Sequence, residues 1–187
     1  MQTFEKRMIA NGHQARYWLI VDSEDGNRII TFLPGRKELH PVITMKFSVR
    51  PGQGEASGFD LGDMVCSGEL GEARSTGHTP DQGMMIYLSV PLLLDCLREW
   101  LRGQTKTLEF IGADTSFGLT FRKEKRHVSV ASAAGPIGTA SAQELAETVL
   151  RASEQLAVEA LASLPADDSA RPDYLAAMSA FRSFHEH

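Results

Sequence analysis

Few residues in this sequence have the types and spacing needed for covalent catalysis. A cysteine thiolate activated by a histidine is a common enzyme nucleophile, and Cys66 with His78 is the one pair that we could assign to such a role. Nothing in the sequence brings the two together, and no third group to orient the histidine can be identified. The sequence also contains no G-x-x-x-x-G-K-[ST] phosphate loop, G-x-S-x-G elbow, H-E-x-x-H pair or C-x-x-C motif. We therefore predict no catalytic residue and no cofactor.

Metal binding needs several histidine, cysteine or carboxylate ligands in one place. Two cysteines, Cys66 and Cys96, are too few for a cysteine-based zinc site, and we expect free thiols rather than a disulfide. The six histidines are dispersed: His13, His40, His78, His127, His185 and His187. A carboxylate site built from Asp60, Asp63 and Asp114 is conceivable, but no motif supports it. We predict no metal.

The clearest compositional signal is an acidic, glycine-rich segment between Arg50 and Gly83. Its core, Glu55–Asp81, contains six carboxylates and one basic residue, Arg74. The carboxylates are Glu55, Asp60, Asp63, Glu69, Glu72 and Asp81. Long glycine-rich connections are either mobile or functional, and we interpret this one as a mobile, solvated connection. Its charge predicts that these six residues contact a basic protein partner.

The elements that would position this segment begin with three predicted strands. Tyr17–Asp22 and Arg28–Leu33 have the aromatic and β-branched content of strands, and Asp25-Gly26 between them predicts a hairpin turn. Apolar and polar residues alternate along Pro41–Val49, which predicts a third strand. Met64–Leu70 is a candidate short strand within the acidic segment.

A helix is predicted over residues 91–102, directly after a strand over Met84–Leu88. Ser89 can cap the helix, and Pro91 is tolerated in the first turn because the first amides lack intrahelical acceptors. Gly103 is placed to end the helix in a left-handed conformation. One helix face carries the apolar residues Leu93, Leu97, Trp100 and Leu101. We interpret this stripe as a packing surface of the core.

Three short strands are predicted after the helix: Leu108–Gly112, Phe117–Phe121 and His127–Ala131. Polar turns separate them, so we expect an antiparallel meander whose middle strand covers the apolar face of the helix. The second turn is the basic run RKEKR, residues 122–126. We interpret it as a solvated hairpin tip, with one side of a charge-complementary protein contact as the alternative.

The C-terminal part is predicted to be helical. Ser141 followed by Glu144 matches a capping box, which starts a long alanine-rich helix over residues 142–163. Pro165 separates it from a short helix over Asp173–Phe184. The fold class is therefore α+β: an antiparallel sheet of about six to seven strands packed by one central helix, followed by a long C-terminal helix and a short terminal helix. Residues 1–138 would hold the sheet with helix 90–102, and residues 139–187 a helical segment of the same domain.

Composition restricts the partners and the location. The chain has 187 residues, 42% of them hydrophobic, and a formal net charge of -5. An acidic balance argues against binding to nucleic acid or to an anionic membrane, since both need basic patches. The sequence contains neither a long apolar leader at its start nor an apolar run of membrane-spanning length, so we expect a cytoplasmic protein.

The stretch LSVPLLLDCLREWLRG followed by LEFIGADTSFGLTF, within Met84–Ala131, resembles the small α+β immunity proteins of bacterial polymorphic toxin systems. The resemblance lies in the order of the elements. It implies a cytosolic antitoxin that binds and covers a toxin or effector without catalysis. Two alternatives stay open. One is an enzyme with a loop-built site, and the other is an assembly protein that forms homodimers through the alanine-rich helix 142–163.

Overall fold

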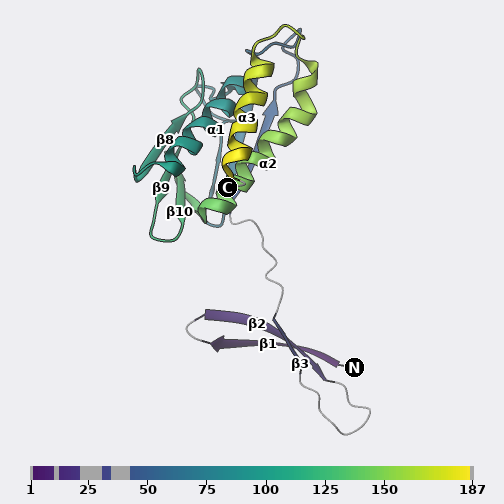
Figure 1. Ribbon diagram of the computed structural model, residues 1–187, viewed down its shortest axis with the longest axis vertical. Helices are drawn as coiled ribbons and strands as arrows, with labels where there is room; N and C mark the ends of the chain where they lie inside the picture. Colours follow the sequence, from purple (N-terminus) through teal and green to yellow (C-terminus); the bar gives the residue numbers. More distant parts are fainter. Residues whose placement is uncertain (1, 11–12, 22–30, 35–42, 186–187) are drawn as a thin grey trace. The chain divides into compact units, whose positions relative to one another are not determined.

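The chain consists of two compact units, Met1–His40 and Pro41–His187 (Figure 1). The computed structural model describes residues 2–10, 13–21, 31–34 and 43–185. The first unit is an antiparallel sheet with the strand order β1-β2-β3. Its strands are β1 (Gln2–Ala10), β2 (His13–Val21) and β3 (Thr31–Pro34).

The predicted pairing of the second and third of these strands is confirmed. Tyr17 lies opposite Pro34, and Ile20 lies opposite Thr31, in antiparallel register. The predicted turn at Asp25-Gly26 lies outside the described residues. The sequence analysis missed β1, whose apolar and charged residues follow no simple alternation.

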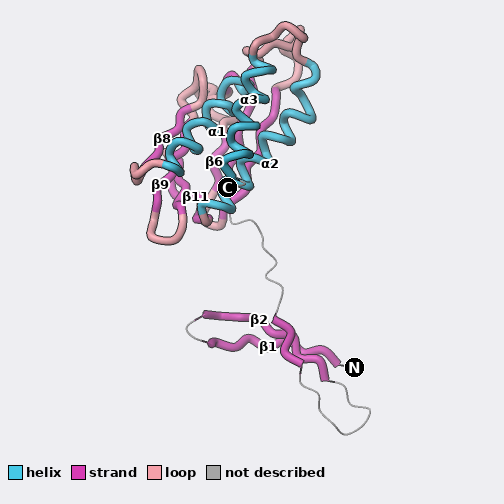
Figure 2. The backbone as a smooth tube through the Cα atoms, in the orientation of Figure 1, coloured by secondary structure: helices cyan, strands magenta, loops and turns pink. Residues whose placement is uncertain are grey.

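Residues 43–185 contain two four-stranded antiparallel sheets (Figure 2). The first has the order β4-β5-β6, with β7 also paired to β5. Its strands are β4 (Ile43–Val49), β5 (Leu61–Gly68), β6 (Glu72–Arg74) and β7 (Met84–Met85). The second has the order β11-β10-β9-β8. Its strands are β8 (Thr107–Ile111), β9 (Gly118–Lys123), β10 (Val128–Ser132) and β11 (Gly135–Ala140).

Three helices accompany these sheets in the described part of the second unit. They are α1 (Ile86–Arg102), α2 (Ala142–Ala160), which continues into a 3-10 turn over Leu161–Ser163, and α3 (Ala170–His185). Helix α1 contacts both sheets, α2 packs on β4, and α3 lies against α1 and α2. The Tyr174 hydroxyl of α3 donates a hydrogen bond to the Ser153 carbonyl of α2 (2.9 Å). No helix among the described residues is long and apolar enough to cross a membrane.

The apolar stripe of α1 is core, as the sequence predicts. Leu93 and Leu97 are completely buried, and the Trp100 ring centre lies 6.4 Å from that of Phe121 in the middle strand of the meander. The Lys123 ammonium donates hydrogen bonds to the carbonyls of Trp100 (2.6 Å) and Gly103 (2.7 Å) at the end of α1. A cation there compensates the negative end of the helix dipole. The first lysine of the RKEKR run is therefore a structural residue rather than part of a solvated tip.

The predicted start and end of this helix are wrong in detail. Residues 86–88 are helical rather than extended, so Pro91 lies inside α1. Ser89 does not cap the helix: its buried hydroxyl donates to the Met85 carbonyl and accepts the Ala113 amide, each at 2.9 Å. Because Ala113 follows β8, this hydroxyl links α1 to the turn after that strand. Gly103 has φ -78°, which is not left-handed.

The α+β class with antiparallel sheets is confirmed, but its arrangement differs from the expectation. The described residues form three sheets in place of the single predicted sheet, and both α1 and α2 pack on strands, where one central helix was predicted. The sequence analysis missed β11 because Pro136 and Gly138 look like breakers. Proline is tolerated there because β11 is an outer strand of its sheet.

The predicted capping box at the start of α2 is confirmed. The Ser141 hydroxyl accepts the Glu144 amide, and the Glu144 carboxylate accepts the Ser141 amide. The C-terminal helices belong to the same compact unit as the two sheets of residues 43–140. The grouping of residues 1–138 apart from 139–187 stays a prediction.

A candidate protein-binding surface

The structure does not gather the six predicted partner-binding carboxylates into one patch. Asp63 is buried within β5, whereas Asp81 lies on an exposed turn before β7. Glu69 directly follows the C-terminal end of β5, and Glu72 is the first residue of β6. The last two, Glu55 and Asp60, lie on the loop that joins β4 to β5. We call residues 51–60 the acidic loop.

Asp63 and Asp81 are joined by one guanidinium. Arg50 donates two hydrogen bonds to Asp63, from Nε at 2.8 Å and from Nη2 at 2.7 Å. It donates two more to Asp81, from Nη1 at 2.6 Å and from Nη2 at 2.9 Å. Gly83 permits this arrangement, since a Cβ at that position would lie 2.5 Å from the guanidinium carbon. Forked pairs of this kind are among the stronger polar contacts in proteins.

The Arg50 cluster changes the acidity of both carboxyl groups. Hydrogen bonds from Arg50 lower the pKa of Asp63, against the effect of burial, and they lower the pKa of Asp81 to about 2. The pKa of Arg50 is raised by the same bonds. The buried Ser75 hydroxyl also donates to Asp63 (2.7 Å) and accepts the Met64 amide (3.1 Å). Asp63 is therefore fully engaged inside the protein, and a role in partner contact no longer follows from its charge.

The remaining predicted carboxylates differ in their bonding. Glu72 pairs with Arg74 and accepts the Ser67 hydroxyl (2.7 Å), and both contacts lower its pKa. Glu69 is exposed on the turn beyond β5. Glu55 is exposed on the acidic loop and forms no ion pair with another described residue. Of the six, Glu55 and Glu69 keep the most solvated charge.

The acidic loop is ordered by its own hydrogen bonds. The Gln53 side chain donates to the carbonyls of Arg50 (2.7 Å) and Leu61 (2.8 Å) and accepts the Leu61 amide (2.6 Å). It thereby fastens the two ends of the loop together. Asp60 accepts the Ser57 amide (3.2 Å), which closes a second, smaller turn. The sequence-based interpretation of this loop as a mobile connection does not fit these contacts.

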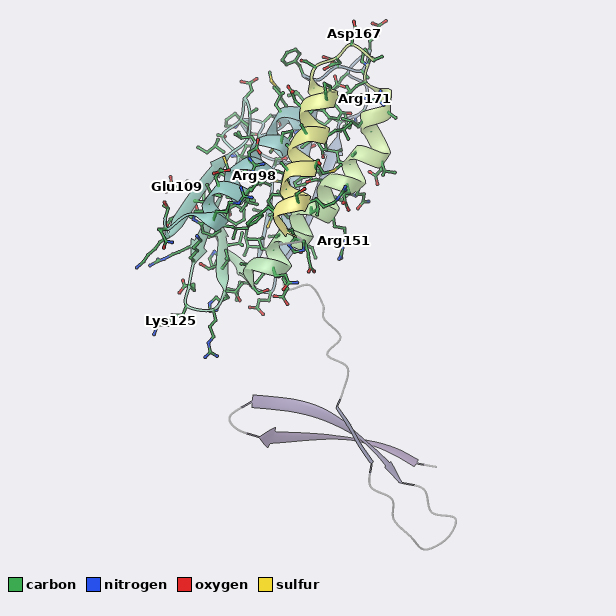
Figure 3. The ribbon with its side chains drawn as sticks, viewed as in Figure 1. Arg98, Glu109, Lys125, Arg151, Asp167 and Arg171 are labelled. Atoms are coloured by element: carbon green, nitrogen blue, oxygen red, sulfur yellow. The ribbon has the colours of Figure 1, made fainter. Side chains whose placement is uncertain are left out.

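The acidic loop is also anchored to the connection between α2 and α3. Asp168 accepts the Gly58 amide at 2.7 Å and the Ala170 amide at 2.9 Å. A Cβ at Gly58 would lie 2.5 Å from the Ala170 Cβ, so a larger residue would push the two segments apart. Figure 3 shows Asp167, the neighbour of Asp168, at one end of the unit, and Lys125 at the opposite end.

An exposed aromatic side chain lies at the end of the unit where the acidic loop meets the α2–α3 connection. Phe59 follows Gly58 and is 67% exposed, more than any other aromatic residue within residues 43–185. The acidic loop and residues 164–169 contain four carboxylates and no lysine, arginine or histidine. We call this region the acidic end; it comprises Glu55, Phe59, Asp60, Asp167 and Asp168. The sequence analysis missed Phe59, Asp167 and Asp168, because only the fold brings the two segments together.

The structure does not support the chemistry considered for Cys66 and His78. Cys66 is buried in β5, and burial raises the pKa of its thiol to about 12, so it is a poor nucleophile at neutral pH. His78 is exposed, and its ring contacts the Arg74 carbonyl (2.8 Å). Both Cys66 and Cys96 are free thiols, as expected. Within residues 43–185 and the described strands before them, no group of three or more possible ligands is placed to hold a metal ion.

Comparison of the chain with protein-family models, curated proteins and solved structures found no match. The function therefore has to be argued from the chain's own surfaces.

Proposed function

We propose that this protein is a non-catalytic binding protein that inhibits a basic protein partner through its acidic end. The observation that carries the proposal is Phe59, a largely exposed aromatic residue on a loop held in place by hydrogen bonds and bordered by carboxylates. The resemblance to immunity proteins supports a toxin or effector as the partner.

Each part of this surface has a distinct role in the proposed complex. Aromatic side chains are enriched among the residues that dominate binding energy, because they bury a large rigid surface. Loop order lowers the entropy that binding must overcome, and the Gln53 and Asp168 hydrogen bonds supply that order here. Carboxylates around the aromatic residue accelerate the encounter with a positively charged partner and disfavour acidic competitors.

The proposed binding surface keeps two of the six predicted carboxylates and includes two others. Glu55 and Asp60 remain in the binding surface, and Asp167 and Asp168 join them. Asp63, Glu72 and Asp81 are ion-paired with Arg50 or Arg74, so their charge is offset within the protein and they act on the fold instead. Glu69 lies apart from the acidic end, on the turn between β5 and β6.

The test begins with the full-length chain as bait in a lysate of its native host. Wild type is compared with Phe59→Ala and with a matched control, Ile111→Ala, which removes another exposed apolar side chain (59% exposed) on β8. We expect a specifically captured basic protein whose affinity falls by about tenfold or more in Phe59→Ala and is unchanged in Ile111→Ala. Equal binding by all three proteins would exclude Phe59 as the anchor.

The role of the charges is tested by measuring association kinetics between this protein and the captured basic partner. The double variant Glu55→Gln/Asp167→Asn should associate more slowly than wild type at low salt, and the difference should shrink as salt rises. Glu109→Gln, an exposed carboxylate on β8, is the control and should leave the association rate unchanged. A salt-independent rate, or an equal loss in the control, would contradict the proposed role of the acidic end.

A further inference from the structure

A groove of about 520 Å³ runs along the outer seam between α2 and α3. Its residues form one stripe on each helix, at the spacing that places side chains on a single face. The stripe on α2 and its 3-10 extension comprises Glu154, Ala157, Val158, Leu161 and Ala162. The stripe on α3 comprises Arg171, Leu175, Met178 and Arg182. The middle of the groove is therefore apolar, and its charged residues lie towards the two ends.

The groove exposes apolar surface that the unit itself does not cover. Val158 is 83% exposed, the highest value among the large apolar residues within 43–185, and Leu175 is 44% exposed. Single exposed apolar residues are ordinary, but here two of them border the same apolar groove. Two small residues, Ala157 on α2 and Ala162 on its 3-10 extension, would let another helix approach closely.

Each end of the groove has an arginine and a carboxylate close by. Glu154 and Arg182 form an ion pair at one end (2.6 Å). At the other end, Arg171 forms no ion pair with any described residue and lies near Asp167 on the α2–α3 connection (Figure 3). A two-fold axis perpendicular to the helices exchanges these ends. It would bring Glu154 of one copy to Arg171 of the other, and Arg182 to the acidic connection.

We propose that the occupant of this groove is a second copy of the same chain, in a two-fold dimer with the axis beside Val158. A two-fold interface must be self-complementary. The α2–α3 face meets this condition because Val158 protrudes beside an apolar groove, and the arginine and carboxylate at each end can face the carboxylate and arginine at the other end of the second copy. The proposal does not depend on the acidic end, so the two can fail separately.

The size of the face indicates whether the dimer would be obligate or reversible. Helices of 19 and 16 residues are about 28 and 24 Å long, and two adjacent helices are about 20 Å wide. The projected face of roughly 500 Å² is smaller than the ~800 Å² that each partner contributes to a standard interface. A face of this size fits a weak, reversible dimer rather than an obligate one, so dimerisation is tested at micromolar concentrations.

Sedimentation equilibrium of the full-length chain over micromolar concentrations tests the dimer. Wild type should approach twice the monomer mass, and Val158→Glu should remain a monomer because a carboxylate would enter the apolar groove. Ile111→Glu is the control, since it adds the same charge at an exposed apolar position on β8. Circular dichroism checks that the variants are folded. A monomeric wild type, or a dimer that persists in Val158→Glu, would overturn the proposal.

Charge reversal tests the two-fold arrangement directly. Arg171→Glu alone places a second carboxylate against Glu154 of the other copy, and Glu154→Arg alone places two guanidinium groups together, so each variant should be monomeric. In the proposed register, a dimer with one chain of each variant has opposite charges at both symmetry-related contacts. The mixture should therefore dimerise more strongly than either variant alone. Folding defects could not produce this rescue. A mixture that stays monomeric while wild type dimerises would overturn the assignment of the contact.

Discussion

Replacing Arg50 by alanine is the change that most directly tests how this structure is held together. The substitution removes both hydrogen bonds to Asp63 and leaves its carboxylate, in a residue that is only 8% exposed, with the Ser75 hydroxyl as its remaining side-chain partner. Removing one member of a fully buried ion pair costs about 3–5 kcal/mol. The Arg50 side chain is 25% exposed, so water can partly replace it. We therefore expect Arg50→Ala to lower the free energy of unfolding by about 2–4 kcal/mol.

Asp81→Asn is the matched control for this prediction. Asp81 shares the same guanidinium, but its side chain is 58% exposed, and ion pairs exposed to this degree contribute little to stability. Urea unfolding followed by helical circular dichroism reports on the second unit, because all helices of the described residues lie there. Equal effects of Arg50→Ala and Asp81→Asn, or a cost of Arg50→Ala below about 0.5 kcal/mol, would refute the view that burial of Asp63 makes this cluster important.

The same cluster predicts a pH dependence. Arg50 lowers the pKa of Asp63 in the folded protein below the value of about 3.9 in an unfolded chain, so the unfolded state binds more protons between the two values. The resulting stability is present above the unfolded pKa and is lost as the pH falls through the folded pKa. The stability difference between wild type and Arg50→Ala should therefore shrink on acidification below about pH 4. A difference that stays constant down to about pH 2 would contradict the assignment.

Three further outcomes follow from the described contacts. Leu97→Ala should cost about 2–5 kcal/mol of unfolding free energy in urea titrations, because it leaves a cavity at a fully buried position. Lys123→Met should cost about 1–2 kcal/mol by removing the charge at the end of α1, whereas Lys125→Met, on the exposed hairpin tip, should cost almost nothing. In the native protein a thiol reagent should modify Cys96 before Cys66, and equal rates would show that the region around β5 opens readily.

Local periodicity was sufficient to predict several elements. Strand β4, the meander β8–β10 and the apolar stripe around Leu97 follow from alternation and helical spacing, which depend only on neighbouring residues. The capping box at Ser141 is similarly local, because both of its hydrogen bonds join residues three positions apart. In these places the backbone conformation is selected by interactions that a short stretch of sequence contains.

The arrangement of charge was decided by the tertiary structure. The sequence determined that residues 55–81 are acidic, but it could not show that Asp63 pairs with Arg50, 13 positions earlier, inside the fold. Composition likewise indicated a mobile loop, whereas a hydrogen bond between Gly58 and Asp168, 110 positions apart, anchors it and completes the acidic end. A carboxylate has the same charge in a loop and in a core. Only the long-range contacts around it determine whether that charge holds the fold together or faces a partner.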